Sequence, residues 1–441
     1  MSRTRTRGRG VLVALLALVA GVGPASAQER THVFTGATIH TMAGEVIDSG
    51  AIVVRDGIIQ AVGAEVPVPL SADVVTHDVS GTVILPGLVD THSHLGGPWA
   101  ADGSEPIQPE CRSLDAIDVR DAGFQKAQAG GVTTANVMPG SGHLLSGQTL
   151  YLKLREAETI DDALIVEDGV VAGGVKMANG TNSQKDAPFP GTRGKSAALV
   201  REAFVAAQDY QRKIEAAGDD ASKMPSRDLG METLVDILEG RRVVHHHTHR
   251  HDDVMTVLRL SEEFGFDVVL HHVSEAWKVA DEIAAAGVPC SIILLDSPGG
   301  KHEAVDLLWK NGRVLEQAGV SVSIHTDDPI TDSRWFLRSA AFAVRAGMSR
   351  DAALAALTIE AAKHLDLDHR VGSLEPGKDA DFVILSGDPL AVRTRVLETW
   401  VEGEKVFDLD DDQDRIWAEG GYGASRPQAF TWCCHGNLEA K

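Results

Sequence analysis

The sequence predicts an α/β protein: a (β/α)8 barrel, or TIM barrel, with a small β-sandwich domain built from the N- and C-terminal segments. The first observation is that eight apolar, strand-like runs alternate with amphipathic helical segments through the middle of the chain. Such a pattern indicates a parallel sheet covered by helices, and eight repeats favour a closed barrel. The second observation is that short alternating runs broken by Gly and Asp lie on both sides of this region. An open doubly wound sheet is the alternative, but no glycine-rich phosphate-binding turn follows the first strand.

Each element is predicted from its own run of residues. The eight strands are expected at TVILPGLVD (82–90), VTTANVM (132–138), QTLYLKL (148–154), VVAGGVKM (170–177), RVVHHH (242–247), FDVVLHH (266–272), VPCSIILL (288–295) and VSVSIHTD (320–327). Helical patterns cover residues 115–129, 196–216, 252–264, 275–286, 303–318, 333–346 and 349–363. The flanking runs at 31–80 and 379–407 both alternate apolar and polar residues, so we expect them to form two halves of one small β-domain. The predicted division is a signal peptide at 1–27, the β-sandwich domain at 28–85 and 366–410, the barrel at 86–365 and an extension at 411–441.

Residues 1–27 have the pattern of a secretory signal peptide. Four arginines up to Arg9 precede the apolar run VLVALLALVA, and Ala25-Ser26-Ala27 fits a cleavage site. A membrane anchor is the alternative, but the apolar run is too short to span a bilayer. We therefore expect a secreted or periplasmic protein with no membrane contact after cleavage.

The mature chain is strongly acidic and contains few cysteines. Removing the four arginines of residues 1–27 moves the formal charge from −22 to −26, which argues against nucleic acid as a partner. Cys290 lies in the apolar run VPCSIILL and is expected to be buried. In an oxidising compartment Cys111 could pair with Cys433 or Cys434, and the sequence leaves this pairing and a homo-oligomer open.

Two histidines mark the end of the first barrel strand. His92 and His94 follow PGLVD as H-x-H, and residues two apart on a strand point to the same side. Two imidazoles on one side of a strand end can bind one metal ion together. Chance surface histidines are the alternative, and the position after an apolar strand argues against it.

Further candidate ligands end the later strands. Seven of the 18 histidines lie between residues 245 and 272, and HHHTHRHDD (245–253) ends the fifth strand. This density also suits a metal-buffering tract, but the more specific interpretation is one ligand at the strand end with the others in the following loop. His272 ends the sixth strand, with His271 as its outward-facing neighbour. Asp327 ends the eighth strand, where a carboxylate can complete a histidine-rich site and accept a proton from a metal-activated water.

Several segments resemble the amidohydrolase superfamily, specifically its exported imidazolonepropionase-like members. These segments are PGLVDTHSHLG, GGVTTANVMPGS, FGFDVVLHHVSEA, HTDDP and GSLEPGKDADFVI, of which the first and last bracket the barrel. The resemblance implies a metal-binding barrel joined to a small β-domain. Carried over residue by residue, it implies metal ligands at His92, His94, His247, His272 and Asp327.

The resemblance bears on two further positions. HTHR (247–250), followed by an acidic pair, is similar to the family's H-A-H-R and favours His247, with His245 and His246 as the alternatives. Lys176 stands where some members carry a carboxylated lysine that bridges two metal ions. A plain substrate-facing or surface lysine is the alternative.

Together these features predict a metal-dependent hydrolase that cleaves an amide, peptide or cyclic amide bond of a small-molecule substrate with metal-activated water. Asp327 is expected to be catalytic and to carry a proton to the leaving nitrogen. Zinc suits the mixture of imidazole and carboxylate, with one or two ions per chain and with iron, manganese or cobalt as alternatives. Deamination at the same site and a non-catalytic exported zinc-binding protein are the competing functions. A strand-end acid opposite an H-x-H pair argues against the second.

Loops 178–195 and 138–148 are expected to shape the substrate pocket. In them, His143 and Arg193 are candidates for binding a substrate carbonyl or carboxylate. The alternative for each is a loop residue in solvent.

Overall fold

The computed structural model describes residues 31–67, 73–97, 102–294 and 302–420. The predicted signal peptide at 1–27 and the 421–441 part of the predicted extension, with Cys433 and Cys434, lie outside the described residues. Within the described ranges Cys111 and Cys290 are free thiols, and Cys290 is buried. No helix in this part of the chain has both the length and the apolar composition that a membrane crossing requires.

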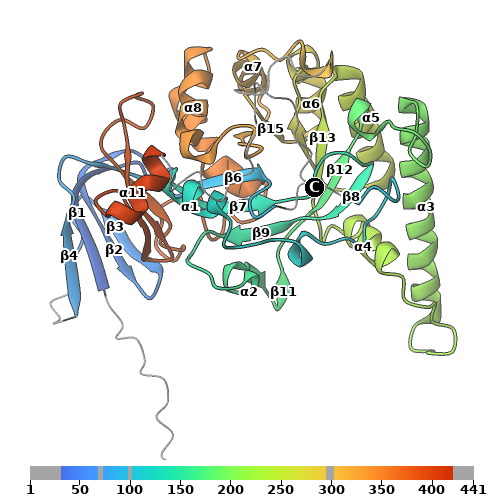
Figure 1. The fold of residues 1–441 in the computed structure, drawn as a ribbon, viewed down its shortest axis with the longest axis horizontal. Coiled ribbons are helices and arrows are strands. Elements are labelled where there is room, and N and C mark those ends of the chain that lie inside the picture. Colours follow the sequence, from blue (N-terminus) through green and yellow to red (C-terminus); the bar gives the residue numbers. More distant parts are fainter. Residues whose placement is uncertain (1–30, 68–72, 98–101, 295–301, 421–441) are drawn as a thin grey trace, which may run out of the picture.

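One eight-stranded sheet combines strands from both ends of the chain. It contains β1 (Thr31–Ile39), β2 (Ile47–Arg55), β3 (Ile58–Gly63), β4 (Val74–Asp78), β5 (Val83–Pro86), β17 (Phe382–Leu385), β18 (Val396–Val401) and β19 (Glu404–Asp408). The order is β19-β18-β17-β5-β1-β2-β3, with β4 paired to β1. Its apolar side chains form a separate core that includes Phe34, Ile52, Phe382 and Trp400. Figure 1 shows this sheet at one end of the molecule. Both flanks thus share one sheet, while a β-sandwich arrangement stays a prediction.

Among the described residues, the middle of the chain forms a six-stranded and a three-stranded sheet, besides a two-stranded pair at residues 166–171. The larger has the order β16-β15-β14-β13-β12-β8 and the smaller the order β6-β7-β9. Their strands are β6 (Leu88–Ser93), β7 (Val132–Val137), β8 (Leu145–Gln148), β9 (Leu150–Lys153), β12 (Val175–Ala178), β13 (Val244–Thr248), β14 (Val268–His272), β15 (Cys290–Ile292) and β16 (Val322–Ile324). Strands β12 to β16 are parallel, as are β6 and β7. An isolated parallel bridge between Ser93 and Asp328 brings the end of β6 next to the residues that follow β16.

The predicted third strand is wrong in its direction. The pattern predicts a parallel strand at 148–154, but β9 runs antiparallel to β7, and β8 runs antiparallel to β12. A parallel neighbour needs a crossover of a dozen or more residues, usually with a helix. Residues 138–149, between β7 and β9, contain no helix. The sheets in this part of the chain are therefore mixed.

The predicted fourth strand, 170–177, is divided into two. Strand β11 (Val170–Val171) pairs with β10 (Val166–Glu167), whereas β12 lies in the larger sheet. Gly173 and Gly174 lie between them and pack against backbone. An added Cβ would come within 2.2 Å of the Thr149 carbonyl oxygen at Gly173 and within 2.4 Å of the Val243 carbonyl oxygen at Gly174. Only glycine permits this close backbone approach, and β11 ends just before the two glycines.

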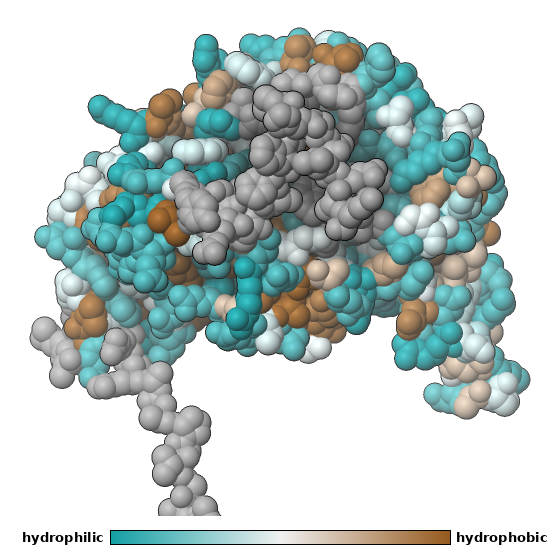
Figure 2. Space-filling view, in the orientation of Figure 1, coloured by the Kyte–Doolittle hydropathy of each residue, from teal (hydrophilic) through white to brown (hydrophobic). Residues whose placement is uncertain are grey.

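Helices cover the outside of the two middle sheets (Figure 1). They are α1 (Ala122–Ala129), α2 (Ile160–Ala163), α3 (Arg193–Ala217), α4 (Leu229–Leu238), α5 (His251–Phe264), α6 (Ala280–Ala286), α7 (Asn311–Ala318), α8 (Phe336–Arg345), α9 (Arg350–Ala355) and α10 (Ile359–Lys363). The last helix, α11 (Asp412–Glu419), instead packs against β19 of the eight-stranded sheet and against α1. The sequence patterns do not predict α4, and the helix predicted at 349–363 is divided because Thr358 leaves the helical backbone region. The surface on the side shown in Figure 2 is mostly hydrophilic, as expected for an acidic chain.

A buried lysine connects the two sheet systems. The Lys153 ammonium on β9 is fully buried and lies 2.8 Å from the carboxylate of Asp379 and 2.7 Å from that of Asp381, just before β17. Breaking such a pair is costly because the remaining charge stays buried without water. The ion pair therefore fixes the end sheet against the part of the chain that carries the candidate ligands.

Candidate metal centre

The C-terminal ends of the parallel strands bring the predicted ligands to one edge of the sheets. His92 lies on β6, His247 on β13, and His272 is the last residue of β14. His94 follows β6 and Asp327 follows β16. Side chains from separate parallel strands can converge at this edge. Here they form two adjoining groups. The ring of His92 in one group and that of His272 in the other have centroids 4.9 Å apart.

His92, His94 and Asp327 form the first group. One carboxylate oxygen of Asp327 lies 3.1 Å from His94 Nε2 and 3.3 Å from His92 Nε2. His94 Nδ1 donates to the carbonyl of Met138 at 2.7 Å, which orients the ring so that its Nε2 faces Asp327. Burial raises the pKa of Asp327, but the hydrogen bond and charge interactions with His94 outweigh it and lower this pKa. An ionised carboxylate therefore faces two imidazoles.

His247, His249 and His272 form the second group. The ring centroids of His247 and His272 are 4.2 Å apart, and His249 stacks on His272 at 5.1 Å. All three are buried, and Nε2 of His272 has no hydrogen-bond partner among the described residues. A buried polar nitrogen without a partner is costly and indicates that something else binds there. The sequence prediction places His249 outside the ligands, whereas the structure includes it in this group.

Left-handed backbone conformations redirect two of these side chains. His272 has φ 67° and Asp327 has φ 53°. Residues other than glycine seldom adopt positive φ, and such strain occurs mainly at functional sites. The turn at His272 interrupts strand alternation, so His271 is not the outward-facing neighbour that the alternation predicts. The His271 ring is fully buried, and its Nδ1 lies 3.2 Å from Nδ1 of His92.

The three neighbouring histidines of β13 lie in different surroundings. His247 pairs in register with His271 and belongs to the second group. His245 lies deeper, with Nδ1 3.0 Å from His271 Nε2 and Nε2 2.8 Å from the Tyr151 hydroxyl. Nδ1 of His246 donates to the carbonyl of His247 at 3.0 Å. Burial lowers the pKa of His245 and that of His246 to about 3, so both rings are neutral.

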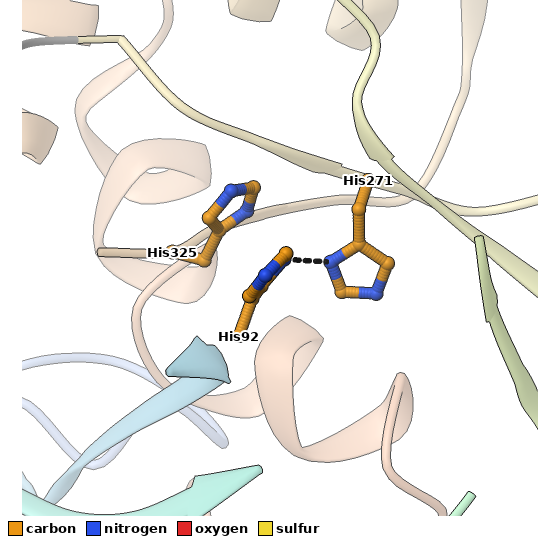
Figure 3. A group of neighbouring side chains, drawn as sticks. All are labelled: His92, His271 and His325. Carbon is orange, nitrogen blue, oxygen red and sulfur yellow. Dashed lines mark hydrogen bonds between the residues drawn. The ribbon is translucent and has the colours of Figure 1, made fainter. Parts of the chain in front are cut away.

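A further buried histidine, His325, is not singled out by the sequence patterns. Figure 3 shows its ring together with those of His92 and His271, each from a separate part of the sheets. Nε2 of His325 lies 3.3 Å from His272 Nδ1, and its Nδ1 lies 2.7 Å from the Ser291 hydroxyl. Residues 321–327 read S-V-S-I-H-T-D, and alternate residues on a strand share one side. This alternation of polar residues is the signal that could have revealed His325.

Lys176 on β12 reaches the first group. Its fully buried Nζ lies 3.1 Å from His92 Nε2 and 3.0 Å from the sulfur of Met138. The side chain thus ends beside a predicted ligand, where a bridging lysine would have to lie.

Two more carboxylates support the strand ends. Asp90 accepts the backbone N–H of His92 at 3.2 Å and that of Thr326 at 3.1 Å, which joins β6 to the residues after β16. Burial raises the pKa of Asp90 to about 7. Asp328 accepts from the backbone N–H and the hydroxyl of Ser333 at 2.9 and 2.6 Å. Asp328 therefore holds the start of the next helical segment.

The two predicted substrate-binding residues belong to neither histidine group. The ring of His143 packs against Phe189, with centroids 5.1 Å apart. Arg193 begins α3 and donates to the buried carboxylates of Asp253 and Glu303 at 2.9 and 2.5 Å. Its side chain is 34% exposed, and its main contacts are internal. Substrate binding by His143 or Arg193 stays a prediction.

The two groups fit a divalent metal ion. Imidazole nitrogens and a carboxylate oxygen are ligands that zinc commonly takes. Two ligands of a tetrahedral zinc ion, each at about 2.0–2.2 Å, lie roughly 3.3–3.6 Å apart. The 3.1 and 3.3 Å separations in the first group are close to that range. The unpartnered Nε2 of His272 supplies a lone pair in the second group. The donor types do not distinguish zinc from iron, manganese or cobalt.

Sequence comparisons identify the family. A model of the amidohydrolase family matches residues 83–411. The amidohydrolase tasK of Hapsidospora irregularis is 26% identical over 391 residues, which cover 81% of this chain and 40% of that protein. The imidazolonepropionase of Pseudomonas fluorescens (strain Pf0-1) is 24% identical over 402 residues, which cover 81% of this chain and 92% of that protein. This chain thus spans less than half the length of the first relative and most of the second.

A solved structure gives the same result. The amidohydrolase of Thermotoga maritima MSB8 matches with a TM-score of 0.80 and 30% sequence identity, covering 86% of this chain and 100% of that one. This similarity implies a TIM-barrel-type fold, although the described strands pair in mixed sheets. The resemblance to the amidohydrolase superfamily, with imidazolonepropionase-like relatives, is confirmed. The chain belongs to the amidohydrolase family and is an enzyme of the class that hydrolyses carbon–nitrogen bonds.

Proposed function

We propose that this enzyme hydrolyses an amide, peptide or cyclic amide bond with the help of one or two divalent metal ions. The observation that carries the proposal is that the group of His92, His94 and Asp327 adjoins the group of His247, His249 and His272 at the strand ends. His92, His94 and Asp327 would hold one ion, and His247 and His272 a second. Zinc is the ion we expect first, because the donor set is mostly imidazole.

Asp327 has the position and the charge of a proton carrier. A divalent ion, when bound, supplies an acidified water and a Lewis acid for the substrate carbonyl. The lowered pKa of Asp327 keeps its carboxylate ionised, and one of its oxygens faces His92 and His94. This carboxylate can therefore accept a proton from a water. It can then donate that proton to the leaving nitrogen, which needs a proton before the carbon–nitrogen bond breaks. The Asp327 backbone N–H donates to the carbonyl of His92 at 2.9 Å and so fixes the carboxylate in this orientation.

Lys176 would act as a bridging ligand in its carboxylated form. Burial and then the charge of Lys176 lower the pKa of His92 well below its ordinary value. An unmodified ammonium at this position repels a cation in the same way. A carboxylated lysine carries a negative charge instead, which suits a site for two cations.

The substrate class is proposed from the relatives together with the loops. An imidazolonepropionase relative supports a cyclic amide, and an amidohydrolase relative supports amides more generally. Loops 138–148 and 178–195, which carry His143 and Arg193, would line the pocket. Because the identities are only 24–26%, the test has to span several amide classes.

Metal removal and reloading test this function. The purified protein is stripped with a chelator, reloaded with zinc, manganese or iron, and screened against dipeptides, N-acyl amino acids, lactams and imidazolones. We expect turnover of at least one class that the chelator abolishes and one ion restores. Ammonia release without amide cleavage would assign deamination instead. A folded, reloaded protein that binds no metal and turns over none of these classes would overturn the proposal.

We also propose a closed (β/α)8 barrel beside a β-sandwich, and export of the protein. The bridge between Ser93 and Asp328 supports closure, because it links the two middle sheets. The arginine-rich and then apolar N-terminus supports export to a periplasm or to the medium. N-terminal sequencing of the mature protein, which should begin at or near Gln28, tests export.

A further inference from the structure

A chain of hydrogen bonds runs along one side of β16 and ends at the candidate metal centre. Ser321, Ser323 and His325 are alternate residues of this segment and point to the same side. Thr91 on β6 and Ser291 on β15 meet them there, and Ser291 is the register partner of Ser323. All of these residues except Ser321 are fully buried.

The links continue without a break from Glu360 on α10 to the ring of His272. From the outside inward, the distances are Glu360 Oε2 to Ser321 Oγ 2.5 Å, Ser321 Oγ to His364 Nε2 2.8 Å, His364 Nδ1 to Ser323 Oγ 2.8 Å, Ser323 Oγ to Thr91 Oγ1 3.3 Å, Thr91 Oγ1 to Ser291 Oγ 2.6 Å, Ser291 Oγ to His325 Nδ1 2.7 Å and His325 Nε2 to His272 Nδ1 3.3 Å. The Glu360 side chain is 24% exposed, so the chain connects the surface with the interior.

The carboxylate at the outer end determines the direction of the first bonds. Burial raises the pKa of Glu360, but hydrogen bonds from Lys363 and Ser321 outweigh it and lower this pKa. An ionised carboxylate only accepts, so Ser321 must donate its single hydroxyl hydrogen to Glu360. The hydrogen between Ser321 and His364 then has to be on Nε2 of His364. Burial lowers the pKa of His364 to about 4, so its ring is neutral and its Nδ1 is bare.

Each hydroxyl group then determines which partner donates in the next hydrogen bond toward the interior. The bare nitrogen accepts from Ser323, and each hydroxyl has only one hydrogen to give. Ser323 must therefore accept from Thr91, and Thr91 from Ser291. Ser291 in turn must accept from Nδ1 of His325. The neutral ring of His325 is left with a bare Nε2, which can only accept.

We propose that Glu360 is a positioning residue which, through this chain, holds His272 in the tautomer whose Nε2 is bare and free to bind a metal ion. Nδ1 of His272 must donate to His325, so the lone pair of the neutral ring is at Nε2. Independently, Nε2 of His272 is the atom for which the described residues offer no hydrogen-bond partner. The inference deepens the proposed function and rests on its metal site. Bonds behind a ligand commonly fix the ring orientation and the binding nitrogen in this way.

A further metal ion among His92, His271 and His325 is the alternative use of this interior. Both nitrogens of His325 already have partners, Ser291 and His272. Its ring is also stacked on that of His92, with planes 23° apart and centroids 4.8 Å apart (Figure 3). An imidazole binds a metal ion in the plane of its ring, so two stacked rings are poorly placed to share one ion. We therefore assign His325 to the hydrogen-bonded chain.

NMR of 15N-histidine in the metal-free protein measures the tautomer, because bare and protonated imidazole nitrogens resonate at well-separated frequencies. The His272 signals are assigned with a His272→Gln variant. Glu360→Gln introduces an amide that can donate to Ser321, and Ser321→Ala cuts the chain. Asp351→Asn, which removes an exposed carboxylate on α9, is the matched control.

We expect a bare Nε2 in the wild type and the control, and mixed tautomers in the two test variants. Zinc affinity should fall about tenfold or more in those two variants only.

Persistence of a bare His272 Nε2 in both test variants, with unchanged zinc affinity, would overturn the proposal. Circular dichroism checks folding, and either test variant is sufficient if the other does not fold. The tautomer measurement requires neither catalysis nor a bound ion. A wild-type protein that binds none of zinc, manganese and iron would therefore refute the proposed function, while the tautomer result would still decide the role of Glu360.

Discussion

Replacing Asp327 by asparagine removes a charge and a proton acceptor while keeping the shape of the side chain. The carbonyl oxygen of asparagine can occupy the position 3.1 Å from His94 Nε2 and 3.3 Å from His92 Nε2. The histidines of both groups also remain. The variant should therefore fold and keep much of its metal, and the effect should be on turnover.

The magnitude follows from the step that is lost. Asp327→Asn can neither accept the proton from the water nor donate it to the leaving nitrogen. Acid–base assistance of this kind is worth about 10²–10⁴-fold, which corresponds to about 2.7–5.4 kcal/mol of activation free energy. Weaker binding of the ion by a neutral ligand would add to this loss, so the expected decrease in kcat is at least about a hundredfold.

The assay combines turnover, metal analysis and thermal unfolding. The substrate is the one found by the screen of dipeptides, N-acyl amino acids, lactams and imidazolones. Asp328→Asn is the control, because Asp328 accepts two hydrogen bonds from Ser333, which an amide oxygen can still accept. We expect this control to keep most of its activity and to lose at most about 1 kcal/mol of stability. Near-normal kcat in Asp327→Asn would refute the role of Asp327, and a large loss confined to Asp328→Asn would transfer that role.

Three further predictions concern the metal ligands Lys176 and His247 and the ion pairs of Glu275. Lys176→Ala should lower the metal content from about two ions per chain to about one, as measured by elemental analysis, if the carboxylated lysine bridges the ions. An unchanged content would show that Lys176 is no ligand. His247→Ala should lose metal, whereas His246→Ala should lose far less, because His246 belongs to neither histidine group and its Nδ1 donates to the His247 carbonyl; the reverse result would shift the strand register. Burial raises the pKa of Glu275, but hydrogen bonds from His251 and Lys278 outweigh it and lower this pKa to about 2. Because the folded pKa lies below the unfolded value of about 4.3, Glu275 stabilises the fold above that pH, and the contribution is lost as the pH falls toward 2. The difference in urea stability between wild type and Glu275→Gln should therefore shrink across this range, and a constant difference would contradict the ion pairing.

The strand-end residues were predictable from sequence because each follows an apolar run. His92, His94, His272 and Asp327 stand where a buried parallel strand stops, and parallel strands stop at a common edge. Their convergence therefore needs only the order of the elements and not the details of packing. The sharing of one sheet by residues near both ends of the chain was also predictable, since both flanks show the same short alternation.

The errors arise where the chain departs from regular periodicity. Strand alternation predicts that His271 faces outward, but the positive φ of His272 changes the direction of the chain there. The run at 148–154 predicts a parallel strand, yet without a helix before it the chain can only return antiparallel. The run VSVSIHTD (320–327) predicts a buried strand, because small hydroxyl residues are compatible with burial. Only their contacts with Thr91 and His364 identify them as members of a polar chain.

The two histidine groups differ in what determines the tautomer of their ligands. The chain behind His272 ends at a carboxylate, which only accepts, so its direction is set before any ion binds. Behind His92, Nδ1 shares a hydrogen with His271, and the contacts continue through His245 to the hydroxyl of Tyr151. A hydroxyl can donate or accept, so the bonds of this second chain alone allow both directions. The two groups that face Nε2 of His92 favour opposite directions, because Lys176 Nζ at 3.1 Å can donate whereas the Asp327 carboxylate at 3.3 Å only accepts. Only the direction in which Tyr151 accepts leaves Nε2 of His92 bare. An ion bound at His92 would therefore select that direction, whereas Nε2 of His272 is bare whether or not an ion is bound.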